Sequence, residues 1–565
     1  MIKYQLLFAL IVSLCLSGTV VAISNHDELI WDIWNNEEGE PFDNNQISCS
    51  SIEDLNTREL CYRNSGEVQS KEEGSFSLEK RKIKTSNVVH DIYNEAPISI
   101  QLEPGSRINY RYLINMSDPA AQQFYEVMVF ITGNLCNFPQ GLSDPNSYLS
   151  LYTAFNDTGI FTNSSDSPFY SQTYNQKDFQ YGYLQSLSDT NVKTNDSFYL
   201  NIVLEADEIE DVNGTFTIQL GLSQDDLIYQ WDNRTWINLV DTDDTTALFM
   251  TGNLTTTYNN ATDILDSSSN YYTVHIFLDE DDNYFSNLNR SWCSIVNGNE
   301  LVKQTNISYS FTQRGGGLKE QMYVKGLQPS TDYIAYVTQD FSSTQHGGVV
   351  FNRLQFSTQE PDTCKLVFNL TFCDNVAYSV PRSNNVQLDS NFQKLADLYD
   401  SNVKDMFGNF SKALQQIPCQ AEDDQRYSPI VTCDDCATSY KNWLCAVSIP
   451  RCTTNNETEY KYRELNESRN DYINSKVDPP SPYYEILPCL SMCHAIVRDC
   501  PTDFGFACPR DNTSIGKSYW FMSDDSAYDT CNYVGALSTS GALPTIGMSR
   551  IGLFISFMVV SLVMF

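Results

Sequence analysis

Hydrophobic and polar residues alternate along the first part of the chain and then change period. Between residues 97 and 361, short runs place apolar side chains at every second position, as in Phe216-Ile218-Leu220-Leu222 and Tyr272-Val274-Ile276-Leu278. Clusters of Asn, Asp, Gly and Ser separate the runs, which is typical of antiparallel strands. We therefore predict a mostly β N-terminal half with two antiparallel β-sandwiches, at residues 97–223 and 224–361.

The period becomes helical after Cys364. Residues 391–417 carry Leu395, Leu398, Met406, Phe410 and Leu414 at the spacing of one helix face. The segment SMCHAIVRDC predicts a second, short helix that carries two cysteines. Twelve of the 17 cysteines lie between Cys364 and Cys531. This concentration predicts an α-rich disulfide module at residues 364–531.

A motif near the end of the second β region indicates its type. Leu327, Pro329, Thr331 and Tyr333 form the pattern L-x-P-x-T-x-Y, which resembles the tyrosine corner of a fibronectin type III sandwich. In such a corner the tyrosine hydroxyl bonds the backbone between two late strands. We therefore expect the second sandwich to be fibronectin-III-like, with a generic β-sandwich as the alternative.

The N-terminus has the order of a secretory signal peptide. Residues 1–22 contain Lys3, then an apolar run, then Val20-Val21-Ala22. An N-terminal membrane anchor is the alternative, but the run is short for a span. Removing the signal leaves sixteen cysteines, an even number that suits an oxidising compartment. Residues 23–96 are predicted to be an acidic, partly ordered leader, in which Lys80-Arg81 is either a processing site or a solvated turn.

The C-terminus ends in a largely apolar stretch of fifteen residues, Ile551 to Phe565. Upstream lie small residues that include Ser540, with a spacer of eight residues between Gly541-Ala542 and the tail. This arrangement within residues 532–565 predicts a linker followed by a signal for a glycolipid (GPI) anchor. Ser540 is the predicted residue to which the anchor is attached. A retained membrane segment is the alternative.

The chain carries fifteen N-x-S/T sequons, a number that predicts heavy N-glycosylation on solvent-facing loops of a secreted glycoprotein. Their asparagines are Asn115, Asn156, Asn163, Asn195, Asn213, Asn233, Asn253, Asn260, Asn289, Asn306, Asn369, Asn409, Asn456, Asn466 and Asn512.

Charge and motifs argue for binding rather than chemistry. A net charge of −36 argues against nucleic-acid partners and against adsorption to anionic lipid. The sequence has no H-E-x-x-H, G-x-S-x-G or P-loop motif, so we predict no catalytic residue and no cofactor.

Two acidic runs are weak candidates for Ca²⁺ binding. The first contains Asp279, Asp281 and Asp282, and the second spans residues 241–246. Clustered carboxylates in loops can supply oxygen ligands to Ca²⁺. Neither run has EF-hand spacing, and a solvated loop is the alternative for both.

The C-terminal module resembles a frizzled-type cysteine-rich domain. The matching segments are CKLVFNLTFCDNVAYSVPRSNN, CATSYKNWLCAVSIPRC and PCLSMCHAIVRDCPTDFGF. The chain departs from the family pattern in a short gap between Cys500 and Cys508 and in the extra cysteines Cys419 and Cys433. The resemblance implies six disulfides, namely Cys364–Cys452, Cys373–Cys445, Cys436–Cys500, Cys489–Cys531, Cys493–Cys508 and Cys419–Cys433. Outside the module we expect Cys49–Cys61 and Cys136–Cys293, the latter joining the two sandwiches.

The chain as a whole resembles the fungal stretch-activated calcium-channel regulatory subunits, the mating-pheromone-induced-death family. The resemblance implies an extracellular auxiliary subunit that binds a four-repeat, voltage-gated-like pore subunit at the plasma membrane, with the endoplasmic reticulum as a further location. We predict that aromatic residues of the module form the contact, because such residues anchor interfaces. They are Tyr440, Trp443, Tyr483, Tyr484, Trp520 and Phe521. A glycolipid-anchored receptor or lipid-binding protein and a cell-wall enzyme remain as alternatives.

Overall fold

The computed structural model describes residues 84–93, 97–116, 126–161, 174–191, 198–209, 212–254, 271–281, 285–298, 306–314, 317–341, 347–386, 392–419, 421, 426–523, 526 and 528–535. Several predictions concern residues outside these ranges. They are the predictions on the signal peptide, Cys49–Cys61, Lys80-Arg81, Asp282, Asn163, Asn195, Asn260, Ser540 and the apolar tail.

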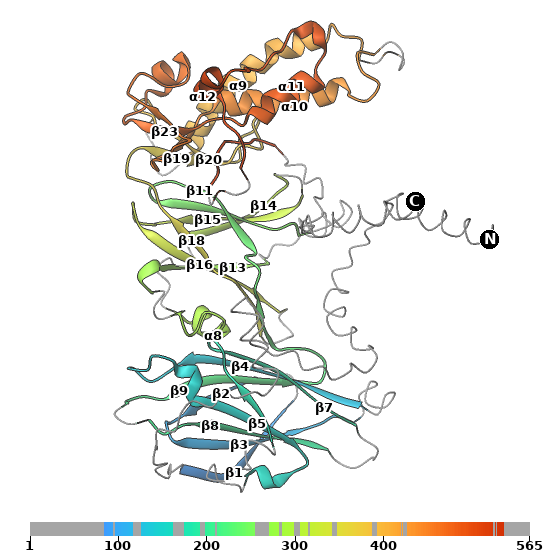
Figure 1. Cartoon of the computed structure of the whole chain (residues 1–565), viewed down its shortest axis with the longest axis vertical. Helices are drawn as coiled ribbons and strands as arrows, with labels where there is room; N and C mark the ends of the chain where they lie inside the picture. The colour runs from blue at the N-terminus through green and yellow to red at the C-terminus, as the bar shows by residue number, and fades with distance from the viewer. Residues whose placement is uncertain are drawn as a thin grey trace, which may run out of the picture. The chain divides into compact units, whose positions relative to one another are not determined.

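The first β region is a two-layer sandwich (Figure 1). One sheet has the strand order β1-β3-β8-β5-β6 and the other β2-β9-β4-β7. The strands are β1 Lys84–Ile92, β2 Ile98–Leu102, β3 Ser106–Leu113, β4 Glu126–Asn137, β5 Leu149–Phe155, β6 Asn175–Asp178, β7 Tyr183–Asn191, β8 Tyr199–Ala206 and β9 Phe216–Ser223. The alternating run in β9 buries Phe216, Ile218, Leu220 and Leu222 in the core between the sheets, as its period predicts.

The first sandwich begins earlier than the sequence pattern indicates. Strand β1 lies within residues 23–96, which we expected to be a leader, yet it pairs with β3. Its apolar pattern is weak because it is an edge strand: Val88 and Val89 are exposed and Ile92 is buried. The pairing is also parallel rather than antiparallel, because the chain crosses to the other sheet as β2 before it returns as β3.

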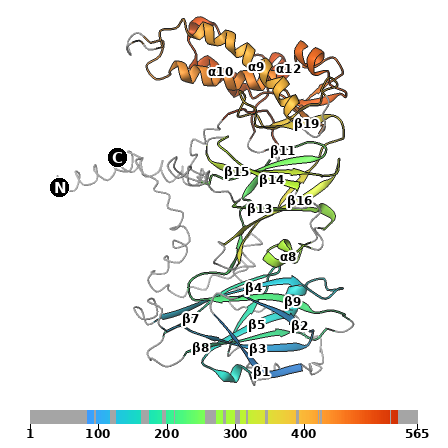
Figure 2. The same ribbon diagram turned by 180° about the vertical axis from the view of Figure 1, so that it is seen from behind.

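The second β region is also a sandwich (Figure 2). One sheet has the order β10-β17-β16-β13 with β18 paired to β16, and the other has the order β11-β12-β15-β14. The strands are β10 Tyr229–Asp232, β11 Ile237–Thr242, β12 Thr246–Thr251, β13 Thr273–Leu278, β14 Ile307–Thr312, β15 Lys319–Lys325, β16 Asp332–Asp340, β17 Gly348–Phe351 and β18 Leu354–Ser357. The pair β10–β17 is parallel, a second exception to the antiparallel prediction.

The tyrosine corner of the second sandwich forms as its motif predicts. Tyr333 is fully buried, and its hydroxyl accepts a hydrogen bond from the backbone N–H of Gln328 at 2.8 Å. The bond closes the turn that enters β16. A short helix, α8 (Trp292–Val296), carries Cys293, and the disulfide Cys136–Cys293 links it to β4 of the first sandwich.

The third region is the α-rich disulfide module, drawn in yellow to red in Figure 1. Its elements are β19 Cys364–Val367, β20 Tyr378–Pro381, α9 Gln393–Leu414, α10 Cys433–Ser448, β21 Arg451–Thr453, β22 Lys461–Arg463, β23 Tyr483–Ile486, α11 Leu490–Asp499 and α12 Asn512–Ser518. Helix α9 buries Leu395 and Phe410 as its spacing predicts, but Met406 is exposed. The predicted fold class, β followed by an α-rich disulfide module, is thus confirmed. No helix in the described ranges is long and apolar enough to cross a membrane.

Candidate functional site at the junction of the second sandwich and the module

The end of β11 and the turn that joins it to β12 present three carboxylates, Asp241, Asp243 and Asp244, to the disulfide module. Asp243 Oδ1 accepts hydrogen bonds from the backbone N–H groups of Thr245 (2.9 Å) and Thr246 (2.7 Å). Asp is favoured in turns because its side chain can bond the backbone in this way. The tight turn leaves Asp241 and Asp244, and the second oxygen of Asp243, free to contact the module.

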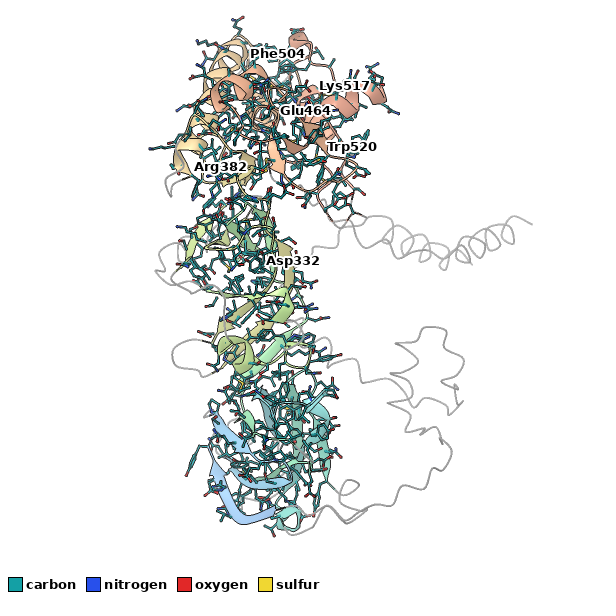
Figure 3. All side chains as sticks on the ribbon, turned by 90° about the vertical axis from the view of Figure 1, so that its left-hand side faces the viewer. Asp332, Arg382, Glu464, Phe504, Lys517 and Trp520 are labelled. Atoms are coloured by element: carbon teal, nitrogen blue, oxygen red, sulfur yellow. A yellow bond between two sulfur atoms is a disulfide. The ribbon has the colours of Figure 1, made fainter. Side chains whose placement is uncertain are left out.

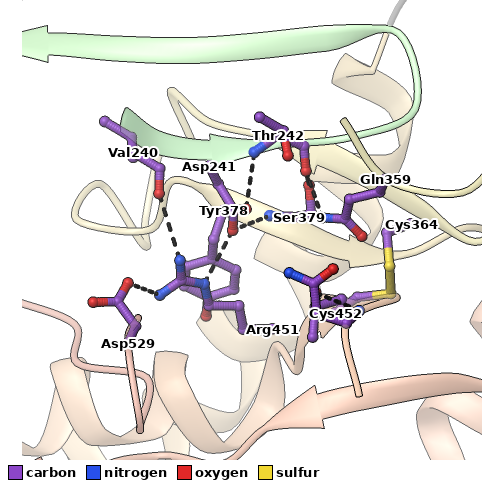
Figure 4. A network of polar contacts seen from close by, with 12 residues as sticks. Val240, Asp241, Thr242, Gln359, Cys364, Tyr378, Ser379, Arg451, Cys452 and Asp529 are labelled. Carbon is purple, nitrogen blue, oxygen red and sulfur yellow. Dashed lines mark hydrogen bonds and ion pairs between the residues drawn. A yellow bond between two sulfur atoms is a disulfide. The ribbon is translucent and has the colours of Figure 1, made fainter. Parts of the chain in front are cut away.

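Cations of the module bind these carboxylates, and Figure 4 shows one of them, Arg451, with Asp241 and Asp529. Lys365 Nζ lies 2.7 Å from Asp243 Oδ2, and Arg451 Nε lies 3.0 Å from Asp241 Oδ2. Arg451 Nη1 also lies 2.8 Å from Asp529 Oδ2, so one guanidinium joins a carboxylate of the sandwich to one of the module. All but Asp529 are largely buried. The junction is therefore a set of shielded ion pairs.

One disulfide fixes the spacing of the two cations. Lys365 follows Cys364 at the start of β19, and Arg451 precedes Cys452 in β21. The bond Cys364–Cys452 links these strands, and both cysteines are buried. Because the bond holds the strands together in advance, the two cations meet the turn without a large loss of conformational entropy.

Further hydrogen bonds from backbone and uncharged side-chain donors complete the polar contacts around the turn. Ser379 donates its backbone N–H to Asp241 Oδ2 at 3.1 Å and its hydroxyl to the Thr242 carbonyl at 2.5 Å. Gln359 Nε2 donates to the same carbonyl at 2.6 Å. Buried polar groups are usually bonded in this manner, since an unbonded group costs free energy.

Apolar side chains pack beside the polar contacts. Leu248 and Tyr323 of the second sandwich form one buried cluster with Leu366, Phe368 and Ala377 of the module. The rings of Tyr323 and Phe368 lie 4.9 Å apart between centroids. The cluster contributes hydrophobic burial, so the junction does not depend on ion pairs alone.

Burial and pairing act in opposite directions on the ionisable groups here. Burial raises the pKa of Asp241, although Arg451 and the hydrogen bond from Ser379 lower it. Burial lowers the pKa of Arg451, but Asp241 and Asp529 outweigh this effect and raise it. The desolvation cost of such a pair offsets much of its attraction, so its main contribution is to a unique arrangement.

A cleft of about 790 Å³ opens beside Arg451. The second sandwich lines it with residues 238–242 of β11 and with residues of β18 and the stretch that follows. The module contributes Arg451, Ile486 and a C-terminal stretch that includes Met522 and Asp529. The volume is within the range of ligand-binding sites.

The structure places the predicted cysteines in pairs. Seven disulfides occur among the described residues, and they match the pairs stated from the resemblance and the one expected between the sandwiches. They are Cys136–Cys293, Cys364–Cys452, Cys373–Cys445, Cys419–Cys433, Cys436–Cys500, Cys489–Cys531 and Cys493–Cys508.

The predicted aromatic contact residues do not form one exposed surface. Tyr483 is buried beside the Cys364–Cys452 bond, so its assignment as a contact residue was wrong. Tyr440 stacks on Phe410 with 3.6 Å between ring centroids, and Trp443 donates its indole N–H to the Tyr519 hydroxyl at 2.9 Å. Tyr484 and Trp520, the latter labelled in Figure 3, are half-buried. Phe521 alone of the six is exposed, at 52%.

The predicted calcium candidates form no metal site in the described residues. Asp279 lies in a short 3-10 helix, Asp279–Asp281, and its carboxylate accepts a hydrogen bond from Gln355 Nε2 at 3.0 Å. No group of three or more His, Cys, Asp or Glu side chains is arranged to hold a metal ion in the part of the chain that the structure describes.

Sequence reasoning missed the role of residues 241–246. We expected the run to bind Ca²⁺ or to be a solvated loop, but its carboxylates pair with cations of the module. The sequence does contain a signal for this role. Lys365 and Arg451 are each adjacent to one of two cysteines, Cys364 and Cys452, that the frizzled resemblance pairs, so the two cations are expected to lie close together.

The sequon asparagines are largely accessible. Of the fifteen, three lie outside the described residues, and of the remaining twelve all but the half-buried Asn289 are exposed. Each of the eleven could carry a glycan without disturbing the core.

Two β-sandwiches, a disulfide module and a charged junction between the second sandwich and the module define a disulfide-bonded protein of several domains. Comparison with known proteins shows its family. The family of stretch-activated Ca²⁺-permeable channel components, Mid1, matches residues 128–537.

Individual relatives agree with the family match. The chain is 37% identical to the stretch-activated cation channel MID1 of Saccharomyces cerevisiae, over 79% of this chain and 87% of that protein. It is 36% identical to the stretch-activated cation channel yam8 of Schizosaccharomyces pombe, over 57% of this chain and 65% of that protein. The chain therefore belongs to the Mid1 family of channel components, and no catalytic family is indicated.

Proposed function

We propose that the chain is an extracellular auxiliary subunit of a plasma-membrane calcium channel. It supports stretch-activated Ca²⁺ influx by binding a separate, four-repeat pore-forming subunit. The observation that carries the proposal is the disulfide framework, because six disulfides in the module and one between the sandwiches, among the described residues, suit an oxidising, extracellular compartment. The exposed sequon asparagines fit the same location.

Co-purification tests this proposal directly. The full-length chain, extracted from membranes in mild detergent, should bring down a polytopic pore protein, and its deletion should reduce Ca²⁺ influx after osmotic swelling. A chain truncated near Pro361 should be secreted but should not retain the pore protein. Full recovery of the pore protein with the truncated chain would contradict a role for the module.

Membrane attachment through a glycolipid at Ser540 belongs to the same proposal. Phospholipase treatment should move the mature protein from the detergent phase to the aqueous phase. Peptides from Ile551 to Phe565 that persist in the mature protein would identify a retained membrane segment instead.

A lipid-binding receptor has less support. The cleft at the junction contains Arg451, Asp241 and Asp529, and a charged lining does not suit an acyl chain.

A further inference from the structure

The cleft beside Arg451 lies against two strand edges. Among the strands that the structure describes, β11 pairs only with β12 and β18 pairs only with β16, so each is an edge strand of its sheet. Five consecutive residues of β11, 238–242, line the cleft, and β18 contributes Leu354, Gln355 and Ser357. Since successive side chains of a strand point to opposite faces, the consecutive lining residues of β11 mean that this strand meets the cleft with its edge.

Edge strands can accept another strand. Their unpaired N–H and C=O groups are a template for an extended segment, and β-strand addition is a recurring mode of peptide recognition. Part of the β11 edge is already bonded, because the Thr242 carbonyl accepts from Gln359 and Ser379. The Val240 carbonyl also accepts from Arg451 Nη2 at 3.5 Å, and the Ser357 carbonyl of β18 accepts from the Thr242 hydroxyl at 3.0 Å. The N-terminal part of β11, around Asn238 and Leu239, and the start of β18, at Leu354 and Gln355, remain as the docking edge.

Two carboxylates, Asp241 and Asp529, line the cleft. Arg451 is the one cation among the described lining residues, and it is shared between Asp241 and Asp529. Asp529 is 65% exposed. Tyr528, at the mouth, donates its hydroxyl to Glu459 at 2.8 Å. The charge at this end of the cleft is therefore negative.

The β18 side is acidic as well. Gln355 and Ser357 of β18 donate hydrogen bonds to Asp279 (3.0 Å) and Asp332 (2.5 Å), which places both carboxylates next to the lining. Figure 3 labels Asp332 on the second sandwich. Complementary charge on a partner would be positive.

The cleft also offers apolar contacts. Leu239, Leu354 and Ile486 contribute to its lining, and Met522 is 46% exposed on the module side. A segment that alternates apolar and basic residues would place one set against these side chains and the other against the carboxylates.

We propose that the cleft between β11, β18 and the module binds an extended, basic segment of the pore-forming subunit by strand addition. This inference rests on the proposed function, since it names the surface and the chemistry of the partner. It also moves the contact from the aromatic residues of the module to the junction.

Site-specific photo-crosslinking tests the location. A photoreactive amino acid is placed at Met522 in the full-length chain, with Tyr462 as the control, because Tyr462 is similarly exposed (48%) but does not line the cleft. Both chains are co-expressed with the pore subunit and irradiated in membranes. Position 522 should crosslink to a peptide rich in Lys and Arg, and position 462 should not. Crosslinking from 462 alone, or from 522 to an acidic peptide, would overturn the proposal.

A matched charge reversal tests the electrostatics. Asp529→Lys removes a partner of Arg451 whose side chain is 65% exposed. The control, Asp374→Lys, removes a partner of Lys441 whose side chain is 62% exposed and does not line the cleft. D529K should reduce co-purification of the pore subunit at least tenfold, and D374K should leave it unchanged. Secretion and a native disulfide map confirm folding. Should D529K fail to fold, crosslinking at position 522 in the otherwise unchanged chain decides the question.

The two levels of the proposal fail differently. If the unaltered chain does not co-purify with any pore subunit, the proposed function is wrong. If it does, and D529K and D374K behave alike, the binding function stands and the cleft is not its site.

Discussion

The two junctions of the molecule are built from different chemistry. The sandwiches meet through the disulfide Cys136–Cys293 and neutral hydrogen bonds, such as that from the Ser291 hydroxyl to the Leu135 carbonyl at 2.8 Å. The second sandwich and the module meet through carboxylates and cations, centred on Asp241 and Arg451. Among the described residues no disulfide crosses this second junction.

The difference concerns how each junction resists separation. A covalent link between residues 157 apart restricts the unfolded chain and is insensitive to salt. A buried ion pair is instead sensitive to substitution, because removing either partner leaves the other as an uncompensated buried charge. The first junction should therefore respond to reduction, and the second to substitution of a single side chain.

Breaking the first junction should have the largest effect. Replacing both Cys136 and Cys293 with Ser should lower the free energy of unfolding by about 4–5 kcal/mol, since the closed loop is long. Urea unfolding followed by tryptophan fluorescence measures the loss, which should be the same at low and high salt. A loss below about 1 kcal/mol would mean that the neutral contacts suffice.

Breaking the second junction should cost nearly as much. Arg451→Ala leaves Asp241 buried without its cation, which should lower the free energy of unfolding by about 3–5 kcal/mol. The control is Asp529→Asn, which removes an exposed partner and should cost no more than about 1 kcal/mol. Equal losses in the two variants, measured by urea unfolding, would contradict the buried position assigned to the Asp241 pair.

The sequence predicted more of the fold than of the site, for physical reasons. The alternation in β9 and the corner at Tyr333 are local patterns, and each depends on neighbours a few residues away. The pair Asp241–Arg451 joins residues 210 positions apart, and a carboxylate in a turn looks the same in sequence whether it meets water, a metal or a cation. Tyr483 and Tyr484 show the same limit within a single strand. Tyr483 is buried and Tyr484 is half-buried, and the pairing of β23 with β21 and β22, which the sequence does not reveal, decides which of the two side chains points into the core.

Glu320 differs from the carboxylates of the charged junction, because backbone N–H groups and no cation contact it among the described residues. Glu320 in β15 is buried, and its carboxylate accepts the backbone N–H of Tyr272 at 3.1 Å. Burial raises its pKa to about 7, although the hydrogen bonds from Tyr272 and Tyr271 lower it.

The raised pKa of Glu320 makes stability depend on pH near neutrality. Its stabilising contribution is fully present below its unfolded pKa, about 4.5, and is lost as the pH rises through about 7. From pH 5 to 8 the free energy of unfolding should fall by up to about 3 kcal/mol. Glu320→Gln should flatten this dependence, whereas Asp529→Asn should not. A pH profile that is unchanged in E320Q would show that another group titrates.

The smallest predicted effect concerns the tyrosine corner, which lies next to the β11–β12 turn of the charged junction. The Tyr333 hydroxyl accepts the Gln328 N–H, and the next residue back, Leu327, donates its N–H to the Thr245 carbonyl in the turn that carries the carboxylates. Tyr333→Phe removes the hydroxyl that accepts the Gln328 N–H at 2.8 Å and donates to the Gln328 carbonyl at 3.5 Å, and it should lower the free energy of unfolding by about 1–2 kcal/mol. If the corner holds the turn in place, the decreases in the free energy of unfolding caused by Y333F and R451A will not be additive, because residues in one hydrogen-bond network depend on one another. The same Y333F change combined with C136S/C293S should be additive. A double-mutant cycle in urea measures both sums, and additivity with Arg451 would show that the turn keeps its position without the corner.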